Sequence, residues 1–341
     1  MSPFKNATTP QTTTVRFLTG TLSRFFLTVL IFAALSIFAV AQRYTVNRPV
    51  SRPAPPPAPL TDELPEHVPL HDTPVQWETD YDFARKTAKK LAKSLLIYLY
   101  ADNDLPELPV GSACRKFDTV ILDDETVRSE LEGYVRLKLP VNAAITDEEG
   151  AKIPLLSLPG FEHMLEHPGL IVIDFASRDE PYYGQLTGIL PFLRGECPTA
   201  KQTETFLTLP PGTLTQRTLV YAVRVHPDQP LSSEGEALPI VVQKATEHAL
   251  YQAERGILGH QNFSVRSSQV KDVIGTGNPS EICAQSRSGE SLFEGAIGCM
   301  RAWRYSSSHW SIARKSHRYY GYDMVQSDRN GCWYAVGFFM D

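Results

Sequence analysis

Over residues 76–197, segments whose apolar residues recur at the spacing of a helix alternate with segments that have the pattern of a strand. Residues 81–93 carry apolar side chains on one helical face and four basic side chains on the opposite face, which predicts a helix. The apolar run Leu95–Tyr100 that follows is typical of a strand buried on both faces of a sheet. The same order then repeats, with a predicted short helix and two further strands at 125–133, 135–141 and 169–175. Helices between strands predict an α/β sandwich over residues 76–197.

The connecting segment, residues 198–235, has a different pattern. The sequence Leu209-Pro210-Pro211-Gly212-Thr213 marks a turn. Residues 218–225, which are rich in β-branched and aromatic side chains, then predict a strand or an extended arm.

The last segment, residues 236–341, opens with a helical pattern. Val241, Ala245, Ala249 and Ala253 recur every fourth residue through a stretch without Pro or Gly, which predicts a long helix over 240–255. The pattern beyond it predicts a helix over 292–303 and a closing strand over 332–339. The segment 281–284 lies before that helix and the serine-rich cluster 306–310 after it, and the family resemblance given below implies a strand at the first and a turn at the second. His248 and His317 are predicted to lie on the surface.

The N-terminal region has the pattern of an export signal. Residues 25–41 are all uncharged and follow a segment, 1–24, with basic but no acidic side chains. Ala39-Val40-Ala41 fits a signal-peptide cleavage site, whereas an uncleaved segment would be a single membrane anchor. Residues 42–75 are predicted to be a proline-rich spacer. Both alternatives place the folded part outside the cytoplasm.

The charge of the chain argues against nucleic-acid binding as its function. The 341 residues include 33 basic and 38 acidic side chains, a net charge of -5 without long blocks of one sign. A nucleic-acid-binding protein would show a basic surface, so no nucleic-acid partner is predicted.

The five cysteines are Cys114, Cys197, Cys283, Cys299 and Cys332. They are too sparse for a disulfide scaffold, and their spacing matches no structural zinc motif. Because an exported chain favours disulfides, one disulfide among Cys283, Cys299 and Cys332 is predicted.

Residues 76–197 resemble the thioredoxin-like fold. Cys114-Arg115-Lys116-Phe117 is similar to the residues at and after the second cysteine of that family's CxxC turn, and Pro168 lies where the family has a cis proline. The position three residues before Cys114 is Gly111, so the vicinal dithiol of thioredoxin chemistry is missing. The resemblance therefore implies a redox-inactive domain, with a monothiol site at Cys114 as an alternative.

Residues 236–341 resemble the CAP superfamily of cysteine-rich secretory, antigen 5 and pathogenesis-related proteins, in its short bacterial SCP-like form. Gly259-His260 is similar to the family's first histidine, and Ser280-Glu281-Ile282 to its Gly-Glu-Asn-Ile strand. Trp303 is followed six residues later by His309, as in the family's helix and turn. Ile282 replaces the family's asparagine, and Ser306 stands where some members have a second acidic residue. The resemblance implies an α-β-α sandwich.

His260, Glu281 and His309 are the candidate site, and three kinds of chemistry are open to them. They could hold a divalent metal ion such as zinc, because His nitrogen and Glu oxygen are zinc ligands. They could polarise a water for hydrolysis, with Glu281 as the base. They could instead form the hydrogen-bonded polar floor of a cleft in which Ser307 and Tyr305 bind a ligand.

The sequence therefore predicts an exported, envelope-associated binding protein with an inactive thioredoxin-like domain and a CAP domain. It would be anchored in the membrane, or secreted or periplasmic after cleavage, and its ligand would be a protein, a glycan or a lipid. The alternatives are a metal-dependent hydrolase at the CAP cleft and a monothiol oxidoreductase that uses Cys114.

Overall fold

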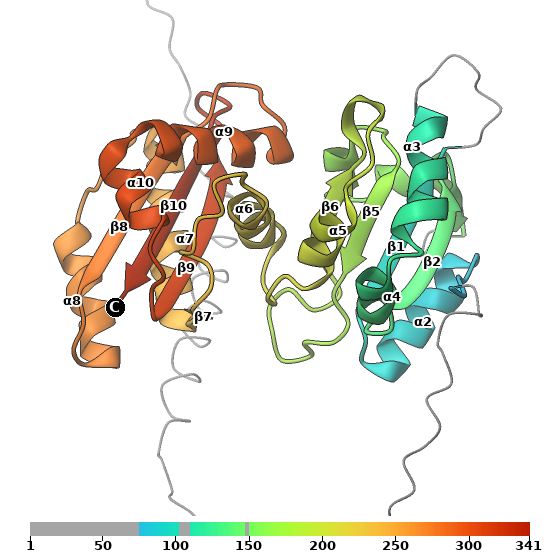
Figure 1. The fold of residues 1–341 in the computed structure, drawn as a ribbon, viewed down its shortest axis with the longest axis horizontal. Helices are drawn as coiled ribbons and strands as arrows, with labels where there is room; N and C mark the ends of the chain where they lie inside the picture. Colours follow the sequence, from blue (N-terminus) through green and yellow to red (C-terminus); the bar gives the residue numbers. More distant parts are fainter. Residues whose placement is uncertain (1–74, 102–109, 147–149) are drawn as a thin grey trace, which may run out of the picture. The chain divides into compact units, whose positions relative to one another are not determined.

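The computed structural model describes residues 75–101, 110–146 and 150–341 (Figure 1). The predicted export segment 25–41, the segment before it and the predicted spacer up to residue 74 lie outside the described residues. Among the helices from residue 75 onward, none is both long and apolar enough to cross a membrane. The described part contains helices and two mixed four-stranded sheets, which confirms the mixed α/β class in general terms.

The first sheet has the strand order β2-β1-β5-β6. Its strands are β1 (Leu95–Tyr100), β2 (Val135–Pro140), β5 (Gly169–Ile173) and β6 (Leu186–Pro191). β1 pairs with β2 in parallel and with β5 antiparallel, and β5 pairs with β6 antiparallel. The sequence pattern predicted the first three of these strands and missed β6.

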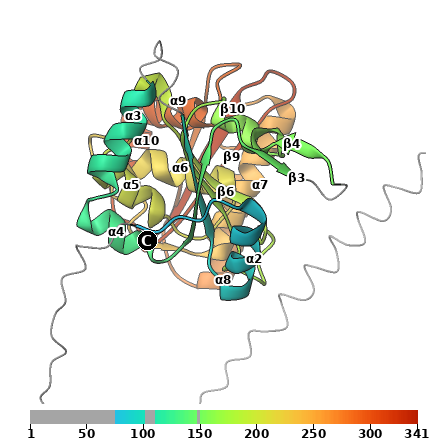
Figure 2. The same ribbon diagram turned by 90° about the vertical axis from the view of Figure 1, so that its right-hand side faces the viewer.

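The helices of this half are α2 (Tyr81–Leu91), α3 (Val110–Lys116) and α4 (Glu125–Leu131), with a π-helical turn at Phe117–Ile121. α2 begins where the predicted helix does, because the Asp80 side chain accepts a hydrogen bond from the Phe83 N–H at 2.8 Å. A short hairpin, β3 (Ala144–Thr146) with β4 (Lys152–Pro154), forms a separate two-stranded sheet (Figure 2).

The prediction of a strand or extended arm at residues 218–225 is wrong. The connecting segment forms two helices, α5 (Ala200–Leu207) and α6 (Leu214–Arg224). Each starts with a capping box, Thr199 with Gln202 and Thr213 with Gln216. Leu219, Val220 and Val223 of α6 are buried, so tertiary burial outweighs their β propensity. The Thr-x-x-Gln spacing is the signal that could have revealed both helices.

The second sheet has the order β7-β9-β10-β8, and β7 with β9 is its parallel pair. Its strands are β7 (Glu236–Ala237), β8 (Pro279–Gln285), β9 (Tyr319–Gln326) and β10 (Trp333–Met340). The helices of this half are α7 (Pro239–Arg255), α8 (Phe263–Ile274), α9 (Leu292–Tyr305) and α10 (Ser307–Ala313). The predicted long helix and closing strand are confirmed, whereas the sequence pattern missed β9 and α8.

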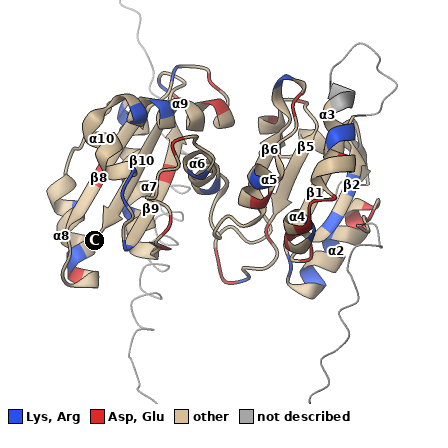
Figure 3. Ribbon diagram, in the orientation of Figure 1, with Lys and Arg blue, Asp and Glu red and all other residues tan. Residues whose placement is uncertain are grey.

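Helices cover both faces of the second sheet. Alternate residues of β10 belong to different apolar clusters: Val336 and Phe338 pack with Val241 of α7, whereas Ala335 and Phe339 belong to the cluster that contains Trp303 of α9. Because successive strand residues point to opposite faces, α7 and α9 lie on opposite sides of the sheet. Basic and acidic residues are mixed along the elements of both halves (Figure 3).

Candidate functional site

The candidate site lies along β8, an edge strand of the second sheet. Glu281 and Cys283 of β8 are two residues apart and so point to the same face, where Cys283 packs in the cluster of α7. α7, α8 and the turn between them supply groups on this face. α10 packs on β8 with Trp310 and Ala313 in the other cluster, so His309 comes from the opposite side.

Glu281 is held by a buried arginine. Nε and Nη2 of Arg266, on α8, both donate to Oε2 of Glu281, at 3.0 and 2.6 Å. Burial alone would raise the pKa of Glu281, but the hydrogen bond from His260 and the charges of His248 and Arg266 outweigh it, so the pKa lies below its ordinary value. Glu281 is therefore ionised at neutral pH.

Glu281 also fixes the orientation of His260. The two side chains meet at 2.9 Å, between Nδ1 of His260 and Oε1 of Glu281. Because the carboxylate is ionised, Nδ1 donates to it, and Nε2 is the ring nitrogen that points away from Glu281. That Nε2 faces the Nε2 of His309 at 3.3 Å.

His309 is the third residue of the candidate site and contacts His260. Burial lowers the pKa of His309, and the neighbouring His260 lowers it further, so the imidazole is neutral at pH 7. The three predicted site residues are thus brought together in the order His309, His260, Glu281, with His260 in the middle.

The spacing of the two imidazoles suits a metal ion. Two nitrogen ligands at about 2.0–2.1 Å from a tetrahedral zinc ion lie about 3.3–3.4 Å apart, which matches the observed 3.3 Å between the two Nε2 atoms. Glu281 contacts the other edge of the His260 ring. An ion between the two Nε2 atoms would therefore have Glu281 as the residue that orients His260 rather than as a third ligand.

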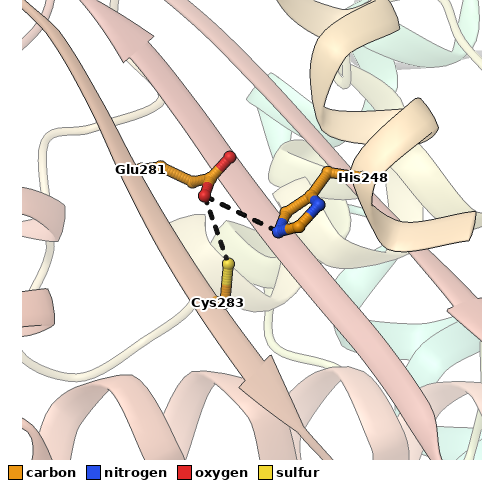
Figure 4. Close-up of side chains that lie close together, drawn as sticks. All are labelled: His248, Glu281 and Cys283. Carbon is orange, nitrogen blue, oxygen red and sulfur yellow. Dashed lines mark hydrogen bonds and ion pairs between the residues drawn. The ribbon is translucent and has the colours of Figure 1, made fainter. Parts of the chain in front are cut away.

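A second group of side chains could also hold a metal ion. Ligand atoms of His248, Glu281 and Cys283, all buried, lie within 4.8 Å of one another (Figure 4). Oε1 of Glu281 is 3.6 Å from Nε2 of His248 and 3.7 Å from Sγ of Cys283. In this group Nε2 of His248 donates to the Gly259 carbonyl at 2.8 Å, and burial raises the pKa of Cys283 well above its ordinary value, so a metal ion would have to displace a proton from each of these two side chains. Two places near Glu281 thus offer ligand atoms for a metal ion, this buried group and the pair of histidines.

His248 has a structural role in the same site. Its Nε2 holds the carbonyl of Gly259, and Oε1 of Gln252 accepts from the Gly259 N–H at 3.0 Å. Gly259 has φ +153°, which a residue with a side chain rarely adopts. Two side chains of α7 thus hold the carbonyl and the N–H of Gly259, the residue before His260. These contacts set the position of the His260 ring.

The prediction that His248 and His317 lie on the surface is wrong, because both are buried. His248 lies three residues after Ala245, on the face of α7 that packs against the sheet. His317 lies between the Asp341 carboxylate, 2.7 Å from its Nδ1, and the Ile312 carbonyl, 3.0 Å from its Nε2.

Residues 306–310 form a helix start rather than the predicted turn. α10 begins at Ser307, so His309 lies in its first turn. Ser307 is exposed and lines a hollow of about 430 Å³ with Arg304, Tyr305 and Trp310. The residues around that hollow do not include His260 or His309.

Cys114 lies near the end of α3 and is buried. It lines a cavity of about 460 Å³ with Asp118 and Lys138, which form an ion pair at 2.7 Å. Cys197 interacts electrostatically with Cys114, but burial is the main influence on Cys197 and raises its pKa.

The predicted disulfide among the last three cysteines is wrong, because all five cysteines are free thiols. Cys283, on the α7 face of β8, and Cys299, of α9, lie on opposite sides of the sheet. Cys332 belongs to a third cluster, with Ala253 and Tyr334.

No family model, curated protein or solved structure matches this chain. The resemblances to the thioredoxin-like fold and to the CAP superfamily stay predictions.

Proposed function

We propose that this chain is an exported binding protein of the cell envelope and that His260 and His309 hold a divalent metal ion, with zinc favoured by the nitrogen donors. The observation that carries the proposal is the contact between the two Nε2 atoms at 3.3 Å, in which the His260 ring is oriented by a buried carboxylate. A zinc ion there would have coordination positions left for water or for a group of a bound partner.

The two predicted domains have different roles in this proposal. Residues 76–197 would be a redox-inactive thioredoxin-like domain, an interpretation supported by its parallel pair of strands and the two antiparallel strands beside it. The second half would be a CAP domain, supported by its sheet between two helical layers. The ligand class, whether protein, glycan or lipid, and the membrane association through residues 25–41 belong to the proposal as well.

Binding is favoured over hydrolysis by the position of Glu281. Its Oε2 is bound to Arg266, and its Oε1 contacts Nδ1 of His260, on the ring edge away from His309. A general base must reach the water that it deprotonates. Both oxygens of Glu281 have partners, and Glu281 contacts the ring edge of His260 opposite to Nε2. It would therefore not reach a water bound to an ion held by the two Nε2 atoms.

A zinc titration of the full-length chain tests the metal site. We expect one tightly bound ion by isothermal titration calorimetry, with His260→Ala and His309→Ala each weakening binding at least 100-fold, since each removes one of two ligands. Cys283→Ser should bind as the parent does. Unchanged affinity in both histidine variants, or loss only in Cys283→Ser, would refute the histidine-pair site.

Redox inactivity has its own test. With dithiothreitol as the electron source, the full-length chain should not accelerate the reduction of insulin disulfides, because Cys114 is buried and has no second thiol three residues before it. The control is Cys114→Ser, which should give the same background rate. Catalysis by the parent that is lost in Cys114→Ser would overturn this part of the proposal.

A further inference from the structure

A groove lies at the junction of α9 and α10. It consists of two adjoining hollows, of about 590 and 430 Å³, which share Arg304 and Tyr305 in their walls. Residues 225–228, directly after α6, form another side of the larger hollow. The two helices contribute residues three or four positions apart, which lie on one face of each helix: Ile297, Met300, Arg301, Arg304 and Tyr305 from α9, and Ser307, Trp310, Ser311 and Arg314 from α10 and its C-cap.

The α9–α10 groove is basic. Three arginines line it, Arg301, Arg304 and Arg314, against one carboxylate, Asp228, which forms an ion pair with Arg304. Arg301 and Arg314 are exposed, and no carboxylate among the described residues forms an ion pair with either of them. The chain as a whole has a net charge of -5, so this positive charge is a local feature. A positive groove attracts anionic partners.

Arg304 is oriented within the groove. Its guanidinium is paired with Asp228 and lies 5.1 Å from the centroid of the Trp310 ring. The His226 ring contacts the same tryptophan, with 5.2 Å between the ring centroids. Trp310 is only 7% exposed, so it forms a fixed surface beneath Arg304. A side chain held in this way loses less conformational entropy when a partner binds.

The groove also has apolar surface. The Tyr305 side chain is 84% exposed although it belongs to the walls of both hollows. Ile297 is 38% exposed, and the larger hollow has further apolar residues in its wall: Ala222, Val225, Pro227 and Met300. Tyrosine and arginine are enriched at the positions that contribute most to protein–protein binding. The combination of basic and apolar surface therefore favours a polypeptide partner.

We propose that the α9–α10 groove binds an acidic segment of a partner protein, in which apolar side chains adjoin carboxylates. An apolar side chain enters the larger hollow, and the carboxylates accept paired hydrogen bonds from the guanidinium groups of Arg301 and Arg314. An acidic glycan offers hydroxyl groups rather than an apolar group to that hollow, and a membrane surface does not enter it. The inference rests on the proposed function only in that the chain is a binding protein, and it names the class of partner.

Fluorescence polarisation with the full-length chain and a labelled peptide of two leucines followed by four glutamates tests this proposal. The peptide should bind, and its analogue with glutamine in place of glutamate should bind at least about 10-fold more weakly, because it keeps the apolar groups and loses the charge. Added salt should weaken binding of the acidic peptide, since the arginines are exposed. A chelator in the buffer keeps zinc out of the measurement, so peptide binding and the metal site succeed or fail independently.

Arg301→Gln combined with Arg314→Gln should weaken binding of the acidic peptide at least about 10-fold, and Tyr305→Ala should weaken it as well. All three side chains are exposed, so both variants should fold as the parent does. Arg255→Gln combined with Arg287→Gln is the matched control. It removes the same charge from exposed positions outside the groove and should bind the peptide as the parent does.

Three results would overturn the proposal: equal binding of the acidic and glutamine peptides, no binding of the acidic peptide at millimolar concentration, or undiminished binding when Arg301 and Arg314 are replaced. Polygalacturonate and phosphatidylglycerol vesicles are the competing probes. Tighter binding of either one, lost in the same double variant, would assign the groove to a glycan or to a membrane surface and would exclude the acidic peptide as its partner.

Discussion

Glu281→Gln should lower the free energy of unfolding by about 3–5 kcal/mol, the range for removing one partner of a buried ion pair. Arg266 would remain buried, at 7% exposure, without the carboxylate that now accepts two of its hydrogen bonds. The amide could also no longer act as a charged acceptor for His260. Chemical denaturation of the full-length chain, followed by circular dichroism, measures the change.

The matched control for this substitution is Glu254→Gln. Glu254 is 61% exposed and is paired only with its neighbour Arg255, so its replacement should change stability by no more than about 0.5 kcal/mol. The double variant Arg266→Gln with Glu281→Gln should lose less than the sum of the two single variants, because no unpaired charge is left. If Glu281→Gln were as mild as the control, the buried pair would not hold the site.

Zinc should stabilise the parent chain, and His309→Ala should abolish that stabilisation. At a free zinc concentration 100 times the dissociation constant, mass action gives about 2.7 kcal/mol, or a rise in melting temperature of several degrees. His309 contacts His260 at the surface of the site, so the variant should fold without zinc much as the parent does. Differential scanning calorimetry with and without zinc measures the rise.

His226→Ala is the control for this experiment. His226, like His309, is a partly exposed histidine, and its ring contacts Trp310 rather than His260. The variant should keep the full zinc-dependent rise. A rise that persists in His309→Ala would mean that zinc binds elsewhere.

Much of the fold could be predicted from the sequence where the pattern was regular. The continuous apolar run predicted β1, and the recurrence of small apolar residues every fourth position predicted α7. The two predictions are distinct because a buried strand and a helix with one buried stripe have different periods. α6 could not be recognised from its β-branched residues. It packs against α5, α9, β6 and β9, and burial decides its conformation more than local propensity does.

The candidate site was predictable in its members but not in its geometry. His260, Glu281 and His309 were each placed near an element boundary by the sequence, yet nothing in the spacing told which edge of the His260 ring would meet Glu281. Arg266 was missed altogether. Its only sequence signal is the four-residue spacing to Val270 on the buried face of α8, and the pairing with Glu281 depends on the tertiary fold.

X-ray absorption at the zinc edge of the full-length chain loaded with one equivalent of zinc tests the histidine-pair site most directly. We expect imidazole nitrogens as ligands, at about 2.0–2.1 Å, with no sulfur in the coordination shell. The signal of two imidazoles should fall to one or disappear in His309→Ala. A sulfur ligand at about 2.3 Å would place the ion at Cys283 with His248 and Glu281, and would contradict a metal site formed by His260 and His309.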